Sequence, residues 1–268
     1  MVYFCTKTFT SKTQHADIIS KRQDNVRQGG QKAHLHPTLP DRGRHSGCGN
    51  GKDGRGGFGS AAGLLQEDSG RELQRYHNFM AAEKMPALLA YNGQAYKHLH
   101  ADSLSDGALE YAQKHLWITC FLYGLLRPMD GIVPYRMEHC VTLEATSNKP
   151  INQFWKDRLT DVLIGSVKAD DGTLLHLSTE EYEHLFDWER VCKEVTVIQP
   201  LFYVRQKDGR LKMLAVWAKS CRGAMVRFIL NNRLVTPEEL SAFNYEGFEY
   251  APLLGNANNP HFVREFIK

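Results

Sequence analysis

The stretch from residue 123 to residue 138 holds side chains that could bind an anion and move a proton. It combines two arginines, two carboxylates and two tyrosines with two prolines that stiffen the loop: Tyr123, Arg127, Pro128, Asp130, Pro134, Tyr135, Arg136 and Glu138. The guanidinium groups suit an anionic ligand, and the carboxylates could orient them or act as general acid and base. A structural turn in which the arginines pair with the carboxylates is an equal alternative, because ion-pair networks also gather charges.

An apolar run, residues 116–122, directly precedes this stretch. A run of this length closed by turn residues predicts a buried strand. Open α/β sheets usually bind their ligands just beyond the carboxyl ends of such strands. The position of residues 123–138 is therefore compatible with a ligand crevice.

Residues 219–231 show the clearest helical pattern. Three apolar residues recur at the spacing of one helical face: Met225, Phe228 and Ile229. Lys219 and Arg222 share a different face, and we place them in the first turn of the helix, directly after a strand. Free N–H groups in a first turn attract anions, and Gly223 would let a ligand or a backbone approach closely. We prefer an anion site over the commoner alternative, a solvated basic face.

A third candidate, residues 176–182, ends a predicted strand with hydroxyl and carboxylate groups. Such a strand end is a common wall of a binding site, and Glu181 is its candidate acid or base. It is equally common as a helix cap, with Ser178 or Thr179 as the capping residue. The residues leave both interpretations open.

The other elements alternate between helices and strands. Helices are predicted at residues 71–82, 105–115, 151–164 and 179–186, with a short one from Pro237; strands are predicted at 173–177, 195–204 and 211–217. The Asp208-Gly209 turn joins the last two strands as a hairpin. This mixture predicts an α/β (or α+β) fold, a single compact domain with a mixed central sheet flanked by helices.

Composition excludes several classes of protein. No run of about 18 apolar residues is present, so we expect no membrane span, and the start lacks the apolar core of a signal peptide. None of the six cysteines forms a Cys-x-x-Cys pair, and the twelve histidines lack metal-ligand spacing. We predict a cytoplasmic protein with reduced thiols, no metal and no cofactor.

Cys221 has cationic neighbours that favour a thiolate, but an incidental helix cysteine is the preferred interpretation.

Several short runs, in one order, resemble the YaaA family of peroxide stress resistance proteins over about residues 67–250. They are the Tyr-Gly-x-Leu-Arg-Pro-x-Asp run at 123–130, Pro-Tyr-Arg-x-Glu at 134–138, Gln-Phe-Trp at 153–155, Lys-x-x-Arg-Gly-x-Met-x-Arg-Phe-Ile at 219–229 and Phe-Asn-x-Glu-Gly at 243–247. Residues 176–182 match the family less well, since His176, Ser178 and Glu180 depart from its pattern. Lys7 and Thr8 match its opening Ser-x-Ala-Lys-Thr motif only partly.

The resemblance implies a cytosolic bacterial protein that protects against hydrogen peroxide, with a basic cleft and DNA as the partner. Our first hypothesis is a DNA-binding stress protein whose cleft is lined by these residues: Lys7, Arg127, Tyr135, Arg136, Lys219, Arg222 and Arg227. Phosphate contacts of this kind make affinity strongly dependent on salt. The alternative is an enzyme acting on a small anionic or nucleotide substrate, with these candidate catalytic groups: Tyr123, Asp130, Glu138 and Glu181.

Residues 1–66 form an atypical basic segment, rich in glycine and arginine, before the YaaA-like domain at 67–268. They hold five lysines and five arginines against four aspartates, a net charge of +6, so the remainder carries −3 of the total +3. A flexible nucleic-acid-binding arm is one interpretation. Residues 49–59 can also be back-translated, with one base dropped, into an ordinary helix former of the kind the family has there. We prefer the hypothesis of a frame error spanning about residues 14–66.

Overall fold

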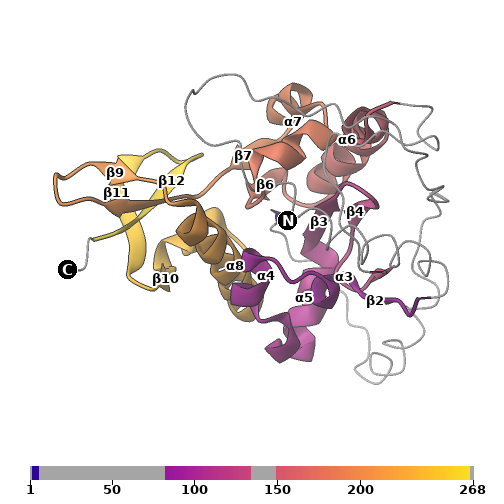
Figure 1. Ribbon diagram of the computed structural model, residues 1–268. Helices are drawn as coiled ribbons and strands as arrows, with labels where there is room; N and C mark the ends of the chain where they lie inside the picture. Colours follow the sequence, from indigo (N-terminus) through magenta and orange to yellow (C-terminus); the bar gives the residue numbers. More distant parts are fainter. Residues whose placement is uncertain (1, 6–81, 134–148, 266–268) are drawn as a thin grey trace, which may run out of the picture.

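The computed structural model describes residues 2–5, 82–133 and 149–265, which build helices around two sheets (Figure 1). The helices are α3 (Ala87–Ala90), α4 (Gln94–Leu99), α5 (Asp106–His115), α6 (Ile151–Ala169), α7 (Trp188–Glu194) and α8 (Ala215–Asn232), with 3-10 helices η1 (Ala101–Ser103), η3 (Glu180–Leu185) and η4 (Pro237–Ala242). The strands are β1 (Val2–Cys5), β2 (Met85–Pro86), β3 (Leu116–Cys120), β4 (Gly124–Leu126), β5 (Gly131–Ile132), β6 (Thr173–His176), β7 (Thr196–Ile198), β8 (Leu201–Arg205), β9 (Leu211–Lys212), β10 (Asn244–Tyr245), β11 (Phe248–Gly255) and β12 (Pro260–Arg264).

The first sheet has the strand order β4-β3-β1-β6-β7. β1 runs antiparallel to both β3 and β6, and β7 runs parallel to β6. β3 and β6 therefore point the same way, so their carboxyl ends, at Cys120 and His176, lie at the same edge of the sheet. This edge is where a ligand crevice was expected.

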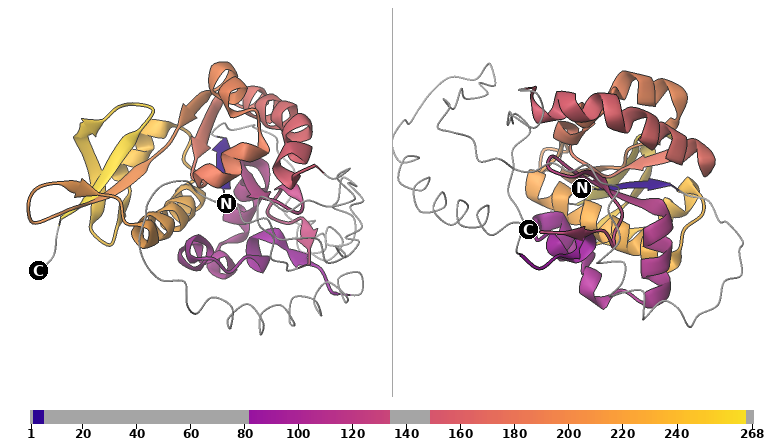
Figure 2. Two further views of the ribbon diagram at one scale, coloured as in Figure 1. Left: turned by 45° about the horizontal axis from the view of Figure 1, so that its top comes forward. Right: turned by 90° about the vertical axis from the view of Figure 1, so that its right-hand side faces the viewer.

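Helices cover both faces of the first sheet, α6 and α7 on one side and α4, α5 and α8 on the other (Figure 2). Successive strand residues point to opposite faces. Leu174 accordingly packs among residues of α6 and α7, whereas Leu175 packs among residues of α5 and α8. Burying each of these leucines stabilises the fold by about 1.5–3 kcal/mol.

The second sheet has the order β10-β11-β12-β8-β9. Phe202, Phe248 and Phe262 fill one face of it and pack against α8, where Trp217 contacts Phe248. Only Gln199 and Pro200 separate β7 from β8, so the chain passes directly from one sheet to the other. The α/β class is confirmed, with the strands divided between two five-stranded sheets and one small pair.

Several predicted elements are confirmed. Ser105 caps α5, accepting a hydrogen bond from the backbone N–H of Ala108 at 3.2 Å. The predicted strand at 116–122 is β3, with a buried turn after Cys120. The helix predicted at 151–164 continues to Ala169, the one at 179–186 is the 3-10 helix η3, and Pro237 begins η4. β8 and β9 form the expected hairpin. The helix predicted at 71–82 falls outside the described residues, apart from its last position.

The prediction of a strand through residues 215–217 is wrong. β9 ends at Lys212, and α8 begins at Ala215, with the Ala218 N–H donating to the Leu214 carbonyl at 2.9 Å. The apolar residues there suggested a buried strand, but Val216 is 65% exposed. In the ranges that the structure describes, no helix has the length and apolarity to cross a lipid bilayer.

Candidate functional site

Arg127, in the turn after β4, is bound by the end of α5 and the start of β3. Its Nη1 donates to the carbonyl oxygens of Lys114 at 2.9 Å and Leu116 at 3.3 Å, and its guanidinium lies 3.4 Å from the ring centroid of Trp117. These acceptors lie at the amino end of β3, away from the edge formed by Cys120 and His176. The structure therefore places Arg127 in a structural bracing role.

Asp130 closes the same turn. Its Oδ2 accepts a hydrogen bond from the Arg127 backbone N–H at 2.8 Å, while its own carbonyl accepts from the Ala87 N–H at 2.8 Å. Burial raises the pKa of Asp130, and the hydrogen bond from Arg127 opposes that shift. Residues 123–133 therefore form a structural turn, but one in which the Arg127 guanidinium binds carbonyl oxygens and its backbone N–H binds Asp130; the expected pairing of Arg136 with Glu138 lies outside the described residues.

Two further motif residues are explained by packing. Gly124 has φ +76°, and a Cβ there would lie 3.0 Å from the ring of Trp155. The Trp155 indole is buried and donates to the Phe121 carbonyl at 2.7 Å. Tyr123 exchanges hydrogen bonds with the backbone of Val133 through its hydroxyl. The predicted residues Lys7, Tyr135, Arg136 and Glu138 lie outside the described residues.

Arg227 joins two helices. Its Nη1 donates to the carbonyls of Leu99 at 3.1 Å and His100 at 2.8 Å, and to the Ser103 hydroxyl at 3.0 Å. It thus satisfies carbonyl groups that the end of α4 leaves without intrahelical partners. Arg227 is occupied by this contact.

Gly223 lets the backbones of α4 and α8 meet. A Cβ at this position would stand only 1.8 Å from the carbonyl oxygen of Ala95. Of the two partners expected for Gly223, ligand or backbone, the structure shows the backbone.

Arg222 differs from the two arginines above. Its Nε is buried and has no hydrogen-bond partner among the described residues, and burial lowers the pKa of the guanidinium. It lines a small hollow between α4 and α8 together with Tyr96 and Leu177. Lys219, one turn earlier, is exposed. Because α8 begins at Ala215, neither residue lies in its first turn, so the expected contribution of free N–H groups to an anion site here is wrong.

Tyr96 lines the same hollow as Arg222, and it also lies near Tyr182 and Cys120 at the edge formed by β3 and β6. Burial raises the pKa of Tyr96 well above its usual value, and the nearby Tyr182 hydroxyl and Cys120 thiol act in the same direction. Tyr182 stacks on Phe121 with ring centroids 4.7 Å apart, and burial raises its pKa as well. Both phenols therefore remain protonated hydrogen-bond donors at neutral pH. We call Arg222, Tyr96, Tyr182 and Cys120 the Arg222 site.

Residues 176–182 contribute to two different places. His176 is buried, and its Nε2 lies 2.8 Å from Glu183 Oε1. Thr179 is the N-cap residue of η3 without a capping side-chain hydrogen bond; its hydroxyl donates instead to exposed Glu181 at 2.9 Å. Glu181 adds its charge near Tyr182, so it flanks the Arg222 site.

Cys221 is an unreactive thiol. It is fully buried, and burial raises its pKa to about 12 despite the opposing charges of Arg264 and Arg222. The incidental helix cysteine is therefore the interpretation that the structure supports.

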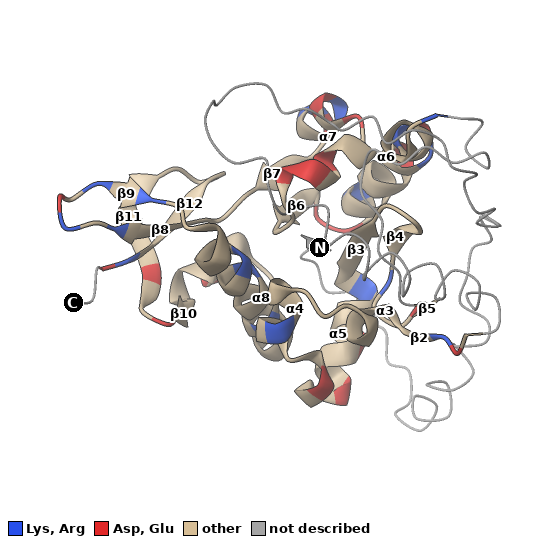
Figure 3. Ribbon diagram, in the orientation of Figure 1, with Lys and Arg blue, Asp and Glu red and all other residues tan. Residues whose placement is uncertain are grey.

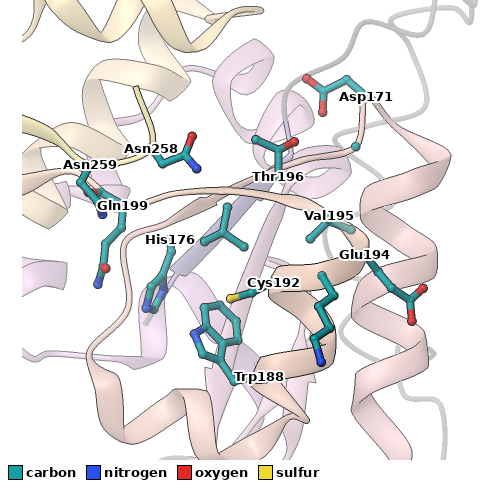
Figure 4. Close-up of a pocket in the computed structure, with 13 residues that line it drawn as sticks. Asp171, His176, Trp188, Cys192, Glu194, Val195, Thr196, Gln199, Asn258 and Asn259 are labelled. Atoms are coloured by element: carbon teal, nitrogen blue, oxygen red, sulfur yellow. The ribbon is translucent and has the colours of Figure 1, made fainter. Parts of the chain in front are cut away.

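Sequence patterns gave no signal for two features of the described residues. One is Tyr96, which reaches the Arg222 site from α4. The other is a pocket of about 660 Å³ beside β7, lined by α7 and by the turn between β11 and β12 (Figure 4). His176 is the one lining residue that had been singled out; the amides Gln199 and Asn258 stand in no recognisable motif.

Comparison with known proteins gives one consistent result. The sequence model of the family described as "Peroxide stress protein YaaA" matches residues 60–254. A UPF0246 protein of Bacteroides thetaiotaomicron is 43% identical over 192 residues, which covers 71% of this chain and 74% of the relative. A UPF0246 protein of Porphyromonas gingivalis is 44% identical over 201 residues, covering 75% and 78% respectively.

Proposed function

This chain belongs to the YaaA family of peroxide stress proteins, and from that premise we propose that it binds a small anionic group, such as a phosphate, at the Arg222 site. We further propose that it does so in the cytoplasm, as part of the response to hydrogen peroxide.

The buried, unpartnered Nε of Arg222 is the observation that supports this most directly. A guanidinium group stays charged in proteins, and leaving a buried donor unpaired costs about 1–3 kcal/mol. An anion would accept hydrogen bonds from it, and the ring of Tyr96 lines the same hollow. The arrangement suits the stabilisation of negative charge.

Duplex DNA is the second candidate. Two of the cations predicted to line its cleft, Arg127 and Arg227, are held by carbonyl oxygens. Among the described residues, Lys and Arg positions are spread over α6, α7, α8 and the hairpin near β9 (Figure 3). The net charge of −3 carried by residues 67–268 also suits a pocket better than a duplex track.

Titration calorimetry with inorganic phosphate, run beside a duplex-DNA binding assay at low and raised salt, tests the proposal. We expect saturable phosphate binding that Arg222→Gln weakens more than tenfold, since hydrogen bonds to charged groups contribute about 1.5–3 kcal/mol. Arg210→Gln is the matched control, because it removes one exposed cation from the β8–β9 hairpin.

The two candidates predict different salt responses. A small-ligand site should respond weakly to salt, whereas duplex binding should fall steeply. Steeply salt-dependent duplex binding, weakened by Lys219→Ala and Arg222→Gln together, would replace the phosphate proposal. Equal phosphate affinity of the Arg222→Gln and Arg210→Gln proteins would refute it directly.

A further inference from the structure

The pocket beside β7 is independent of the Arg222 site. His176 lines it, while the next residue, Leu177, lines the hollow around Arg222, and successive strand residues point to opposite faces. Its volume of about 660 Å³ lies within the range of small-molecule sites. Its size is therefore sufficient for a small-molecule ligand distinct from any bound at Arg222.

Charged side chains around this pocket already have partners. Glu194 binds Lys168 at 2.6 Å and Arg190 at 2.7 Å, and the Lys193 ammonium binds Glu189 at 2.6 Å. An anionic or cationic ligand would have to compete with these ion pairs. The pocket is therefore better suited to an uncharged ligand.

Uncharged polar groups in the pocket are available instead. The side-chain amides of Gln199 and Asn258 and the hydroxyl of Thr196 make no hydrogen bond to any described residue. Their backbones are fixed, since the Gln199 N–H donates to the Asn258 carbonyl at 2.7 Å and the Asn259 amide donates to the Gln199 carbonyl at 3.4 Å. The backbones that carry these two amides are thus fixed, one in the joint between β7 and β8 and one in the turn between β11 and β12.

An aromatic wall faces these amides. Figure 4 shows Gln199 and Asn258 on one side of the pocket and Trp188 with Cys192 on the other. His176 supports the Trp188 ring at a centroid distance of 5.0 Å. Indole rings stack on flat heterocycles, nucleobases included.

We propose that this pocket binds the heterocyclic base of a nucleoside. A carboxamide offers a donor and an acceptor side by side, which matches the edge of a base such as adenine. Gln199 and Asn258 recognise that edge, Trp188 covers the face of the ring, and the hydroxyl of Thr196 offers one more polar contact. Because the charged residues are already paired, the recognised part of the ligand is the neutral base.

Adenosine is the first probe, with guanosine, cytidine and uridine beside it and ribose as the test for simple sugar recognition. Calorimetry on the full chain should show saturable binding of at least one nucleoside and none of ribose. Gln199→Ala and Asn258→Ala should each weaken it roughly tenfold, the value of one hydrogen bond to a ligand. Gln153→Ala, an exposed amide on α6, should bind as the unchanged protein does.

Tryptophan fluorescence gives a second readout, in which nucleoside quenching is lost in Trp188→Phe. Thermal unfolding of each variant verifies that it is folded, and Arg222→Gln should keep full nucleoside affinity because that site is separate. The proposal is overturned by the absence of saturable nucleoside binding, by ribose binding as tightly as adenosine, or by folded Gln199→Ala and Asn258→Ala proteins that bind normally.

Discussion

Arg127 and Arg222 both stand in short arginine motifs, yet their surroundings are opposite. The Arg127 guanidinium has carbonyl acceptors at 2.9 and 3.3 Å and lies over the ring of Trp117. Arg222 is half-buried beside Tyr96 and Leu177, and its buried Nε has no hydrogen-bond partner among the described residues. The fold uses the Arg127 guanidinium, whereas we propose that the Arg222 guanidinium binds the ligand. The hydrogen-bond partners of each guanidinium group, rather than the residue type, are the criterion by which we distinguish the two arginines.

The largest expected effect concerns the helix contact that positions Arg222. Gly223→Ala should lower the free energy of unfolding by about 3 kcal/mol or more, because the new Cβ would stand 1.8 Å from the Ala95 carbonyl oxygen. Gly165→Ala in α6 is the control: with nothing within 4 Å of its Cβ, it should stabilise by about 0.5–1 kcal/mol. Urea unfolding measures both, and equal effects of the two substitutions would show that α4 and α8 are less closely packed than described.

Arg127→Gln and Arg222→Gln should have opposite consequences. Arg127→Gln should cost about 2 kcal/mol of stability, through the lost carbonyl bonds and the lost contact with Trp117, and leave phosphate binding unchanged. Arg222→Gln should leave stability unchanged or raise it, because it removes a desolvated charge, and should abolish tight phosphate binding. Thermal unfolding measures the change in stability, and calorimetry on the same samples measures the change in phosphate affinity. Comparable stability loss in both variants would end the distinction between them.

Asp130 gives a smaller effect with a definite sign. Its pKa is raised in the folded protein, so the native state binds its proton more tightly than the unfolded state does. The contribution of Asp130 to the free energy of unfolding is largest below the unfolded pKa of about 3.8. It decreases as the pH rises through the folded pKa. Asp130→Asn should therefore flatten the decline of stability above pH 4 and stabilise the protein slightly at pH 7. Unfolding measured from pH 4 to pH 7 tests this; a steeper decline in the variant would contradict it.

Lys219→Gln should have the smallest effect. The side chain is exposed, so the free energy of unfolding should change by less than about 0.5 kcal/mol. Phosphate affinity should fall only a few-fold, because a solvated ammonium near a site contributes modestly. A loss as large as that of Arg222→Gln would place the anion at the exposed end of α8 rather than in the hollow.

Local signals in the sequence predicted one helix start, one strand of the first sheet and one hairpin of the second sheet. Ser105 before α5, the apolar run of β3 and the Asp208-Gly209 turn each carry their information within a few residues. The start of α8 was missed because Val216 and Trp217 suit a strand equally well. Two contacts could not be predicted in this way. The hydrogen bond from Arg127 to Lys114 and the close approach of Gly223 to Ala95 join elements that only folding brings together.

Site residues were less predictable for the same reason. Arg222 was selected on a helix-start argument that the earlier start of α8 removes; our present proposal rests instead on its buried Nε, which lacks a partner among the described residues. Tyr96 could not be selected, since nothing near it along the chain points to Tyr182 or Cys120. Gln199 and Asn258 meet only because two sheets are adjacent.

The two-residue joint between β7 and β8 has a mechanical consequence. Pro200 fixes its own φ and restricts Gln199 to extended conformations, and the Gln199 N–H is tied to Asn258 at 2.7 Å. The connection between the two sheets is therefore short and conformationally restricted, unlike a flexible linker. A rotation of the β8–β9 hairpin would therefore also move β7. A molecule bound between Trp188 and the amides would lie next to this joint and would restrict rotation of one sheet relative to the other.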